Sequence, residues 1–140
     1  MQVTFDTTFF VSHYFSKEES VVGKTREILR RSVLQGSRGI VPTIVLAEFY
    51  AQAAKKTGAA EADRRFKEIT DYSLEVVDLD TTISRKAAIL RHKYEEKIPW
   101  GDRLIAATGI ESKSHYIITE DPEFKSFKEI KCKTIENVNL

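Results

Sequence analysis

The chain alternates between short apolar runs and longer stretches in which apolar residues recur at helical spacing. Short apolar runs bounded by turn residues are typical of buried strands, and the longer periodic stretches are typical of helices that bury one face. Because strands and helices follow each other in turn, the pattern predicts an α/β fold with a parallel sheet flanked by helices on both faces. We predict strands at residues 1–5, 39–41, 74–78, 116–119 and 133–135, and helices near residues 17–33, 44–56, 62–69, 80–94 and from 102 onward.

Several boundaries follow from local signals. Ser16 and Glu19 have the spacing of a capping box, and Thr43 can cap the helix that follows Pro42. A turn-forming Pro-Trp-Gly precedes Asp102, so we expect a helix to begin at that residue. The helices that begin near residues 80 and 102 must both fit into one connection between two strands, which we expect to be neighbours.

The first strand is more polar than a central parallel strand normally is. Gln2 and Thr4 interrupt its apolar residues, whereas central parallel strands are apolar nearly throughout. This strand is therefore either less buried than the others or stabilised by neighbours that the pattern does not identify.

The composition is that of an ordinary globular protein. A length of 140 residues with 41% hydrophobic and 31% charged residues predicts a single domain, residues 1–140. A net charge of +1 neither suggests nor excludes a polyanionic partner. Cys132 is the single cysteine and cannot form an internal disulfide, and no signal peptide or membrane-spanning segment is recognisable. We therefore expect a cytoplasmic protein without a membrane partner.

Four acidic residues map to the carboxyl ends of the predicted strands, where ligands bind in such folds. Asp6 ends the first strand, Glu48 lies in the second turn of the helix after the second, Asp102 begins a helix, and Asp121 follows the fourth strand. Carboxylates about 5 Å apart repel by roughly 3 kcal/mol per pair at an effective dielectric of 20, so the group needs protons or a cation. Oxygen ligands without histidine or cysteine favour Mg²⁺ or Mn²⁺.

Each acid also has a simpler interpretation. Asp102 could cap its helix, Asp6 and Asp121 could form turns, and Glu48 could extend to solvent. Only their convergence favours a metal site. Trp100, next to this group, could stack on a nucleobase, although packing against the core or its edge is the more common role.

Four segments together resemble the PIN-domain family, and specifically the small VapC-type toxin ribonucleases of prokaryotic toxin–antitoxin pairs. The resemblance spans essentially the whole chain, and the segments occur in the family's order. They are Phe5-Asp6-Thr7, Pro42-Thr-Ile-Val-Leu-Ala-Glu48-Phe, Trp100-Gly-Asp102-Arg-Leu-Ile-Ala-Ala-Thr108 and Ile117-Ile-Thr119-Glu-Asp121-Pro-Glu-Phe124.

The resemblance implies a PIN-like three-layer α/β/α sandwich with about five short parallel strands. It implies a Mg²⁺- or Mn²⁺-dependent endoribonuclease in which Asp6, Asp102 and Asp121 are the main metal ligands. Glu48 would be a further ligand, and Thr119 would orient a carboxylate or a water. It also implies an RNA substrate, an antitoxin protein as partner, and a homodimer. Two features depart from the family pattern, Trp100-Gly101 and the polar first strand. These departures bear on the substrate groove and not on the acids.

Three other functions remain open from the sequence. A PIN nuclease of RNA processing or repair would act without an antitoxin. A catalytically silent PIN scaffold that binds RNA or protein should lose at least one of the four acids. A receiver-type signalling domain has a similar size and an acidic pocket, but it needs a lysine after its last strand that has no convincing counterpart here.

Overall fold

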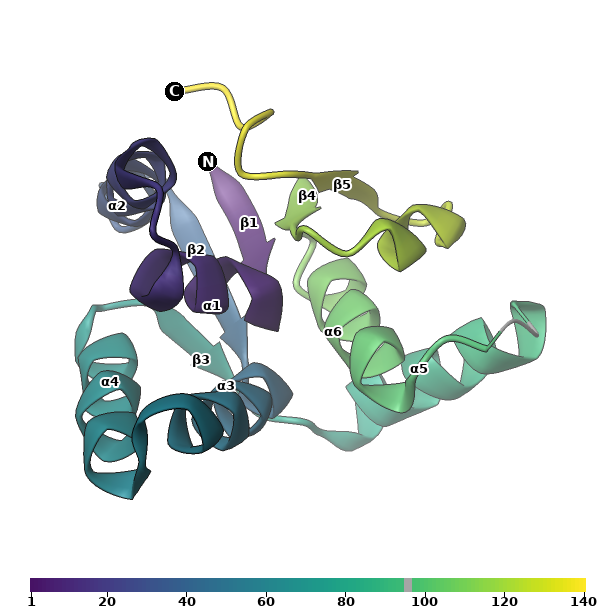
Figure 1. Cartoon of the computed structure of the whole chain (residues 1–140). Coiled ribbons are helices and arrows are strands. Elements are labelled where there is room, and N and C mark those ends of the chain that lie inside the picture. Colours follow the sequence, from purple (N-terminus) through teal and green to yellow (C-terminus); the bar gives the residue numbers. More distant parts are fainter. Residues whose placement is uncertain (95–96) are drawn as a thin grey trace.

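The computed structural model describes residues 1–94 and 97–140, and in this part of the chain five parallel strands form one sheet flanked by six α-helices (Figure 1). The strand order is β3-β2-β1-β4-β5. The elements are β1 (Gln2–Phe5), α1 (Thr7–Phe15), α2 (Glu19–Ser32), β2 (Arg38–Pro42), α3 (Thr43–Thr57), α4 (Ala59–Asp71), β3 (Glu75–Val77), α5 (Thr81–Lys93), α6 (Trp100–Glu111), β4 (Tyr116–Ile118), the 3-10 helix η1 (Pro122–Ser126) and β5 (Lys131–Lys133).

The strand order reverses at β1. The chain moves outward from β1 to β2 and β3, then returns across the sheet to β4 and β5 on the other side of β1. Right-handed crossovers then put α1 to α4 on one face and α5 and α6 on the other. The prediction of a parallel α/β sandwich with about five strands is confirmed. The carboxyl ends of β1 and β4 lie side by side at the reversal, which is where such sheets bind ligands.

We expected the connection that contains α5 and α6 to join neighbouring strands, and this prediction was wrong. The connection joins β3, at one edge of the sheet, to β4, with β2 and β1 between them. Because this connection crosses two strands, both helices fit into it, which answers the question that the sequence left open. Helix α6 packs against β1, β2 and β4. Its later part, at Gly109, lies against Thr4 and Ile117, and its first turn, at Gly101, lies against Glu48 of α3.

The polar first strand is the most central strand, and its neighbours stabilise it. Thr4 is completely buried, and its hydroxyl shares a hydrogen bond of 2.7 Å with the Ser114 hydroxyl. A buried hydroxyl with a partner avoids most of the cost of leaving water. Of the two alternatives that the sequence left open, stabilisation by neighbours is the one found.

Aromatic packing fixes the segment around Asp6. The Phe5 ring lies 4.6 Å from that of Phe9 and 5.5 Å from that of Phe10, and Phe10 contacts Phe49 of α3 at 6.3 Å between ring centroids. All four rings are buried. Aromatic pairs at these separations stabilise a core beyond their buried area, so α1 and α3 are held against the end of β1.

Four predicted boundaries were wrong in detail. Ser16 does not form a capping box with Glu19, because its hydroxyl accepts the Glu18 amide at 3.2 Å and α2 begins only at Glu19. Thr43 belongs to α3 and accepts a hydrogen bond from the Leu79 amide at 3.3 Å instead of capping the helix. Helix α6 begins at Trp100, two residues before the expected start. The last strand lies at Lys131–Lys133, two residues early.

No helix within residues 1–94 and 97–140 combines the length and the apolar character that crossing a membrane requires.

Candidate metal centre

Asp6 is a buried carboxylate held by two hydroxyl groups. It follows β1, its amide donates to Ile118 O at 3.1 Å, and only 3% of its surface is exposed. Its Oδ2 accepts hydrogen bonds from the hydroxyls of Thr8, at 2.8 Å, and Thr119, at 2.7 Å. Burial raises the pKa of Asp6, and the two hydroxyl donors partly oppose that rise.

Thr119 connects the ends of β1 and β4. Its Oγ1 donates to Asp6 and accepts the amide of Asp121 at 2.9 Å. The Thr8 hydroxyl lies 3.4 Å from that of Thr119 and accepts the Glu120 amide at 2.9 Å. This network fixes the orientation of the Asp6 carboxylate. The resemblance implied such an orienting role for Thr119, which stays a prediction for catalysis.

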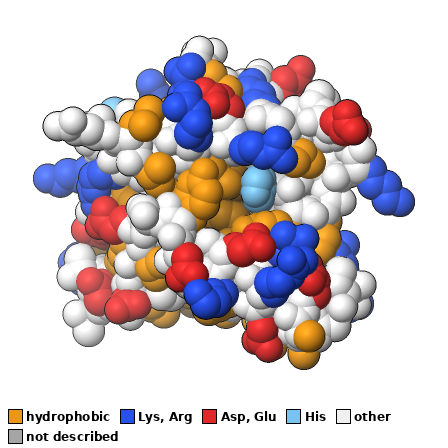
Figure 2. Space-filling model, turned by 90° about the vertical axis from the view of Figure 1, so that its left-hand side faces the viewer, with side chains coloured by type: hydrophobic (Ala, Val, Ile, Leu, Met, Phe, Trp, Pro, Cys, Tyr) orange, Lys and Arg blue, Asp and Glu red, His pale blue; other side chains and the backbone are white. Residues whose placement is uncertain are grey.

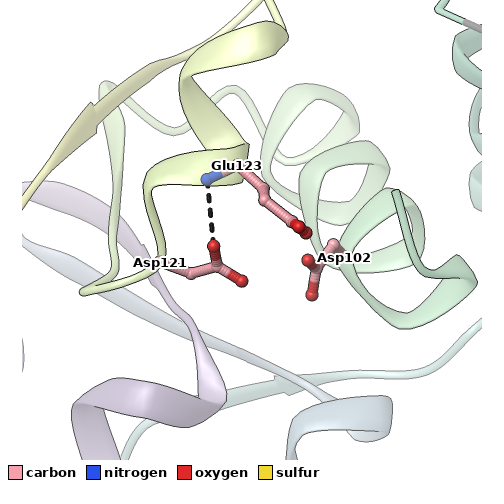
Figure 3. A group of neighbouring side chains, drawn as sticks. All are labelled: Asp102, Asp121 and Glu123. Atoms are coloured by element: carbon pink, nitrogen blue, oxygen red, sulfur yellow. Dashed lines mark hydrogen bonds between the residues drawn. The ribbon is translucent and has the colours of Figure 1, made fainter. Parts of the chain in front are cut away.

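Asp121 combines the turn role and the cluster role that the sequence left as alternatives. Its Oδ1 accepts the Glu123 amide at 2.9 Å, which caps the 3-10 helix η1. Figure 3 shows that its carboxylate also faces Asp102. The turn therefore directs the acid toward α6.

Asp102 lies in the first turn of α6 and is not the residue that caps it. The N-cap position is occupied by Pro99. The Oδ2 atom of Asp102 is buried and has no hydrogen-bond partner among the described residues. Burial raises the pKa of Asp102 to about 8, with further contributions from the negative charges of Asp121, Asp6 and Glu48. A buried carboxylate oxygen without a donor is unusual and indicates a missing partner.

The start of α6 is held by a buried arginine. Arg103 has no exposed surface, and its guanidinium donates to the carbonyl oxygens of Ile98, at 3.1 Å, and Tyr94, at 3.0 Å. It also donates to Leu90 O, so the end of α5 and the segment before α6 are held together. Because Arg103 is the residue after Asp102, these bonds set the position of the acid.

Glu48 reaches the site from α3. Its Oε1 accepts the hydroxyl of Thr7 at 2.7 Å, so the side chain does not simply extend to solvent. A Cβ atom on Gly101 would lie only 2.7 Å from Oε2 of Glu48. The Glu48 side chain can therefore lie this close to α6 because residue 101 is a glycine. Burial raises the pKa of Glu48, and the charge of Asp6 adds to that rise.

Two of the four predicted acids form a compact group with a third acid that we did not predict. One carboxylate oxygen each of Asp102, Asp121 and Glu123 lie within 4.8 Å of one another. Figure 3 shows the three side chains converging from α6 and from the segment after β4. Asp6 and Glu48 are outside this group of three, although both act electrostatically on Asp102. The signal for Glu123 was its place two residues after Asp121, in the turn that Asp121 caps.

The donor set fits a hard divalent cation. The oxygens come from carboxylates, without a histidine or cysteine ligand in the group, and such sites favour Mg²⁺ or Mn²⁺. A cation would give the buried Oδ2 of Asp102 a partner and offset the repulsion among the acids.

Comparison with known proteins gives the family. The family model described as "PIN domain" matches residues 3–130. The chain belongs to the PIN-domain family. The predicted resemblance is thereby confirmed, and the PIN fold agrees with the observed sheet. No curated protein matches the chain at a significant level.

Solved structures with the same fold come from toxin–antitoxin systems. VapBC2 from Rickettsia felis, bound to a promoter DNA fragment, is 18% identical with a TM-score of 0.77 and covers 96% of this PIN domain protein and 98% of its own chain. VapC20 from Mycobacterium tuberculosis, a sarcin–ricin loop cleaving toxin, is 14% identical with a TM-score of 0.70 and coverage of 91% and 98%. A toxin–antitoxin complex from Klebsiella pneumoniae is 16% identical with a TM-score of 0.67 and coverage of 91% and 94%.

Proposed function

We propose that this PIN-domain protein is a divalent-metal-dependent endoribonuclease and the toxin of a toxin–antitoxin pair. The observation that carries the proposal is the buried Oδ2 of Asp102, which lacks a hydrogen-bond partner among the described residues and faces other carboxylates. Such an arrangement is costly unless a proton or a cation completes it, and a cation would also offset the repulsion among the other acids. The similarity to solved toxin structures supports the choice of substrate and biological role.

In this proposal Asp6, Asp102 and Asp121 hold Mg²⁺ or Mn²⁺, with Glu48 as a further ligand. Glu123 joins them because its carboxylate lies within the group formed with Asp102 and Asp121. A bound divalent cation supplies activation of water and neutralisation of charge on the phosphodiester. The Thr119 hydroxyl keeps Asp6 in one orientation through its 2.7 Å hydrogen bond. Asp102 would hold the cation as an ionised carboxylate, because a carboxylate that ligates a metal must be deprotonated.

Cleavage of RNA by the purified protein tests this function. A mixed RNA pool is incubated with Mg²⁺, with Mn²⁺ and with EDTA, and Asp6→Asn is run in parallel. We expect internal cuts that require the metal and disappear in the variant. Unchanged cleavage in EDTA, or an active Asp6→Asn variant, would overturn the proposal.

Two alternatives predict different outcomes. A catalytically silent PIN scaffold would bind RNA without cutting it under any metal condition. A nuclease of RNA processing or repair would cut RNA but would not be inhibited by a protein encoded beside its own gene. The cluster of acids favours catalysis over the scaffold, because a scaffold has no use for the repulsion that the cluster creates.

A pocket between α1 and α4 fits the proposed antitoxin. Figure 2 views the molecule from the side of α2 and α4 and shows apolar side chains bordered by charged ones. The pocket has a volume of about 500 Å³ and is lined by two tyrosines, a histidine and four charged side chains, and tyrosines are enriched at protein interfaces. Its lining residues are His13, Tyr14, Arg64, Lys67, Glu68, Asp71 and Tyr72.

Inhibition by the neighbouring gene product tests the partner. We expect that protein to suppress RNA cleavage, and Tyr72→Glu to remove the suppression while the free enzyme still cuts RNA. Full suppression of the variant would exclude this surface. The predicted homodimer is a separate question, which light scattering of the purified protein answers.

A further inference from the structure

A small pocket adjoins the acid cluster on the side of β5. It has a volume of about 60 Å³, and its wall includes Asp121 of the cluster and Thr119, which orients Asp6. The Thr119 amide donates to Lys133 O at 3.0 Å, so the end of β5 is bonded directly to the end of β4 that carries the site. The pocket therefore borders the proposed metal centre.

Two lysines on the wall of this pocket bring positive charge to it. Lys125 comes from η1, the helix that Asp121 caps, and Lys133 is the last residue of β5. The Lys133 Nζ lies 4.5 Å from the centroid of the Tyr116 ring. Lys125 is exposed and forms no ion pair with another residue in the described part of the chain. Lys125 is therefore available to an anion, and Lys133 is a second positive charge beside it.

The thiol of Cys132 links Lys125 to the buried acid Asp6. Burial raises the pKa of Cys132 to about 11, the charge of Asp6 adds to this rise, and the charge of Lys125 opposes it. Both charges therefore act on one side chain, which lies on the wall of the pocket. The thiol is protonated at neutral pH and donates to Phe124 O at 3.5 Å, so it adds no negative charge.

Two acids share the pocket wall with the lysines, and both have other partners. Glu120 Oε1 accepts the Ile135 amide at 2.8 Å, and the Asp121 carboxylate faces Asp102 (Figure 3). In the proposed function a cation neutralises the charge of Asp121. The two lysines then outweigh the one remaining carboxylate, so the pocket attracts an anion.

We propose that this pocket binds the RNA phosphate next to the one that is cut, and that Lys125 is its main contact. The proposal rests on the proposed function, because it requires an RNA backbone at the acids. The volume is about twice the roughly 30 Å³ that one water molecule occupies in the liquid, which leaves room for a small anionic group and not for a nucleobase. A lysine ammonium binds phosphate as a point charge. A strand that has its cut phosphate at Asp102 and Asp121 brings a neighbouring phosphate to the adjoining pocket.

One substitution in the protein combined with one in the RNA tests this contact. The probe is the shortest RNA that the unsubstituted protein cuts. A neutral methylphosphonate replaces the phosphate on one side of the cut bond, and then the phosphate on the other side. We expect one of these two positions to raise KM as much as Lys125→Gln does, and we expect Lys125→Gln to have no further effect on that RNA, because the contact is already lost.

The salt dependence of KM separates a phosphate contact from a structural role. Lys125→Gln should raise KM by up to about 10-fold at about 50 mM salt, and should lower the slope of log(1/KM) against log salt by about 0.7, the value for one phosphate contact on a single strand. The value of kcat should change little, because the contact forms before and during the reaction alike. Lys125→Arg should keep the parent's KM.

The matched control is Lys113→Gln. It removes the same charge from an exposed position before β4, at the opposite end of the sheet from the acids, and should leave KM and its salt dependence unchanged. An equal rise of KM in this control would assign the effect to net charge and overturn the subsite.

The outcomes distinguish the subsite from the proposed function. A KM of Lys125→Gln equal to that of its parent, or an effect of Lys125→Gln that persists on both neutral RNAs, overturns the subsite and leaves the nuclease intact. If the unsubstituted protein cuts no RNA with either metal, the proposed function fails and the subsite fails with it.

Discussion

Replacing Asp102 by asparagine should stabilise the metal-free protein at neutral and mildly basic pH. The pKa of Asp102 rises from an ordinary 3.8 to about 8 because of burial and the neighbouring acids. Each pH unit of such a difference corresponds to about 1.4 kcal/mol, which gives an upper limit of about 6 kcal/mol. The residue is only partly buried, so solvent screening reduces the expected gain in the free energy of unfolding to about 1–3 kcal/mol.

The direction of the change in unfolding free energy with pH follows from proton binding. Between pH 3.8 and about 8 the folded protein holds a proton on Asp102 that the unfolded chain releases, so the native state loses stability as pH rises through this window. Asparagine carries no charge and avoids this loss. The variant and the unsubstituted protein should therefore be equally stable near pH 4, and the variant should gain its full advantage by pH 8.

Thermal and urea unfolding in EDTA across this pH range measure the effect. A gain of 1–3 kcal/mol corresponds to a rise in melting temperature of roughly 3–10 °C for a chain of this size. Adding Mg²⁺ should stabilise the unsubstituted protein and not the variant. The matched control, Asp80→Asn, retains the cap that Asp80 makes with the Ile83 amide at 2.8 Å and should change little. An Asp102→Asn protein less stable than its parent at pH 8 in EDTA would contradict the proposed burial and repulsion at Asp102.

Three further substitutions test how the site is positioned. Thr119→Val removes the hydroxyl that holds the Asp6 carboxylate. It should lower the free energy of unfolding by about 1–3 kcal/mol and the rate of cleavage by about 10-fold or more. Thr119→Ser should recover both, and a fully active valine variant would exclude a role of Thr119 in positioning Asp6. Gly101→Ala places a Cβ 2.7 Å from Glu48 Oε2, so cleavage should fall although helix propensity improves by up to about 1 kcal/mol. Gly23→Ala, whose Cβ meets nothing within 4 Å, should gain similar stability with unchanged cleavage. Glu123→Gln should raise the metal concentration needed for half-maximal cleavage, and an unchanged requirement would remove Glu123 from the site.

The sequence predicted the sheet and the end of it that carries the acids, because both depend on local periodicity. Asp6 and Asp121 were placed after the first and fourth strands of a parallel sheet, at the end where Asp102 was also expected, and the structure brings Asp102 and Asp121 together. These inferences need only the period of apolar residues and the direction of each element. They do not need the side-chain conformations.

What the sequence did not predict depends on contacts between distant segments. Glu123 joins the acids only through the turn that Asp121 caps, and its place two residues after Asp121 is the single signal for it in the sequence. Trp100 is half-exposed in the first turn of α6, which begins two residues earlier than its apolar pattern suggested. The buried Arg103 is satisfied by carbonyl groups before α6, a pairing that spacing cannot reveal. Ser16 and Thr43 had capping chemistry, but their hydroxyls bind other amides.

The binding of Mn²⁺ to the purified protein, followed by electron paramagnetic resonance of the free ion, tests the cation site directly. This measurement does not require knowledge of the RNA target. We expect the unsubstituted protein and the Asp80→Asn control to bind Mn²⁺, and Asp102→Asn to bind it at least about 10-fold more weakly. Equal affinity of the Asp102→Asn variant and its parent, or no binding by the parent, would contradict the claim that these carboxylates form a cation site.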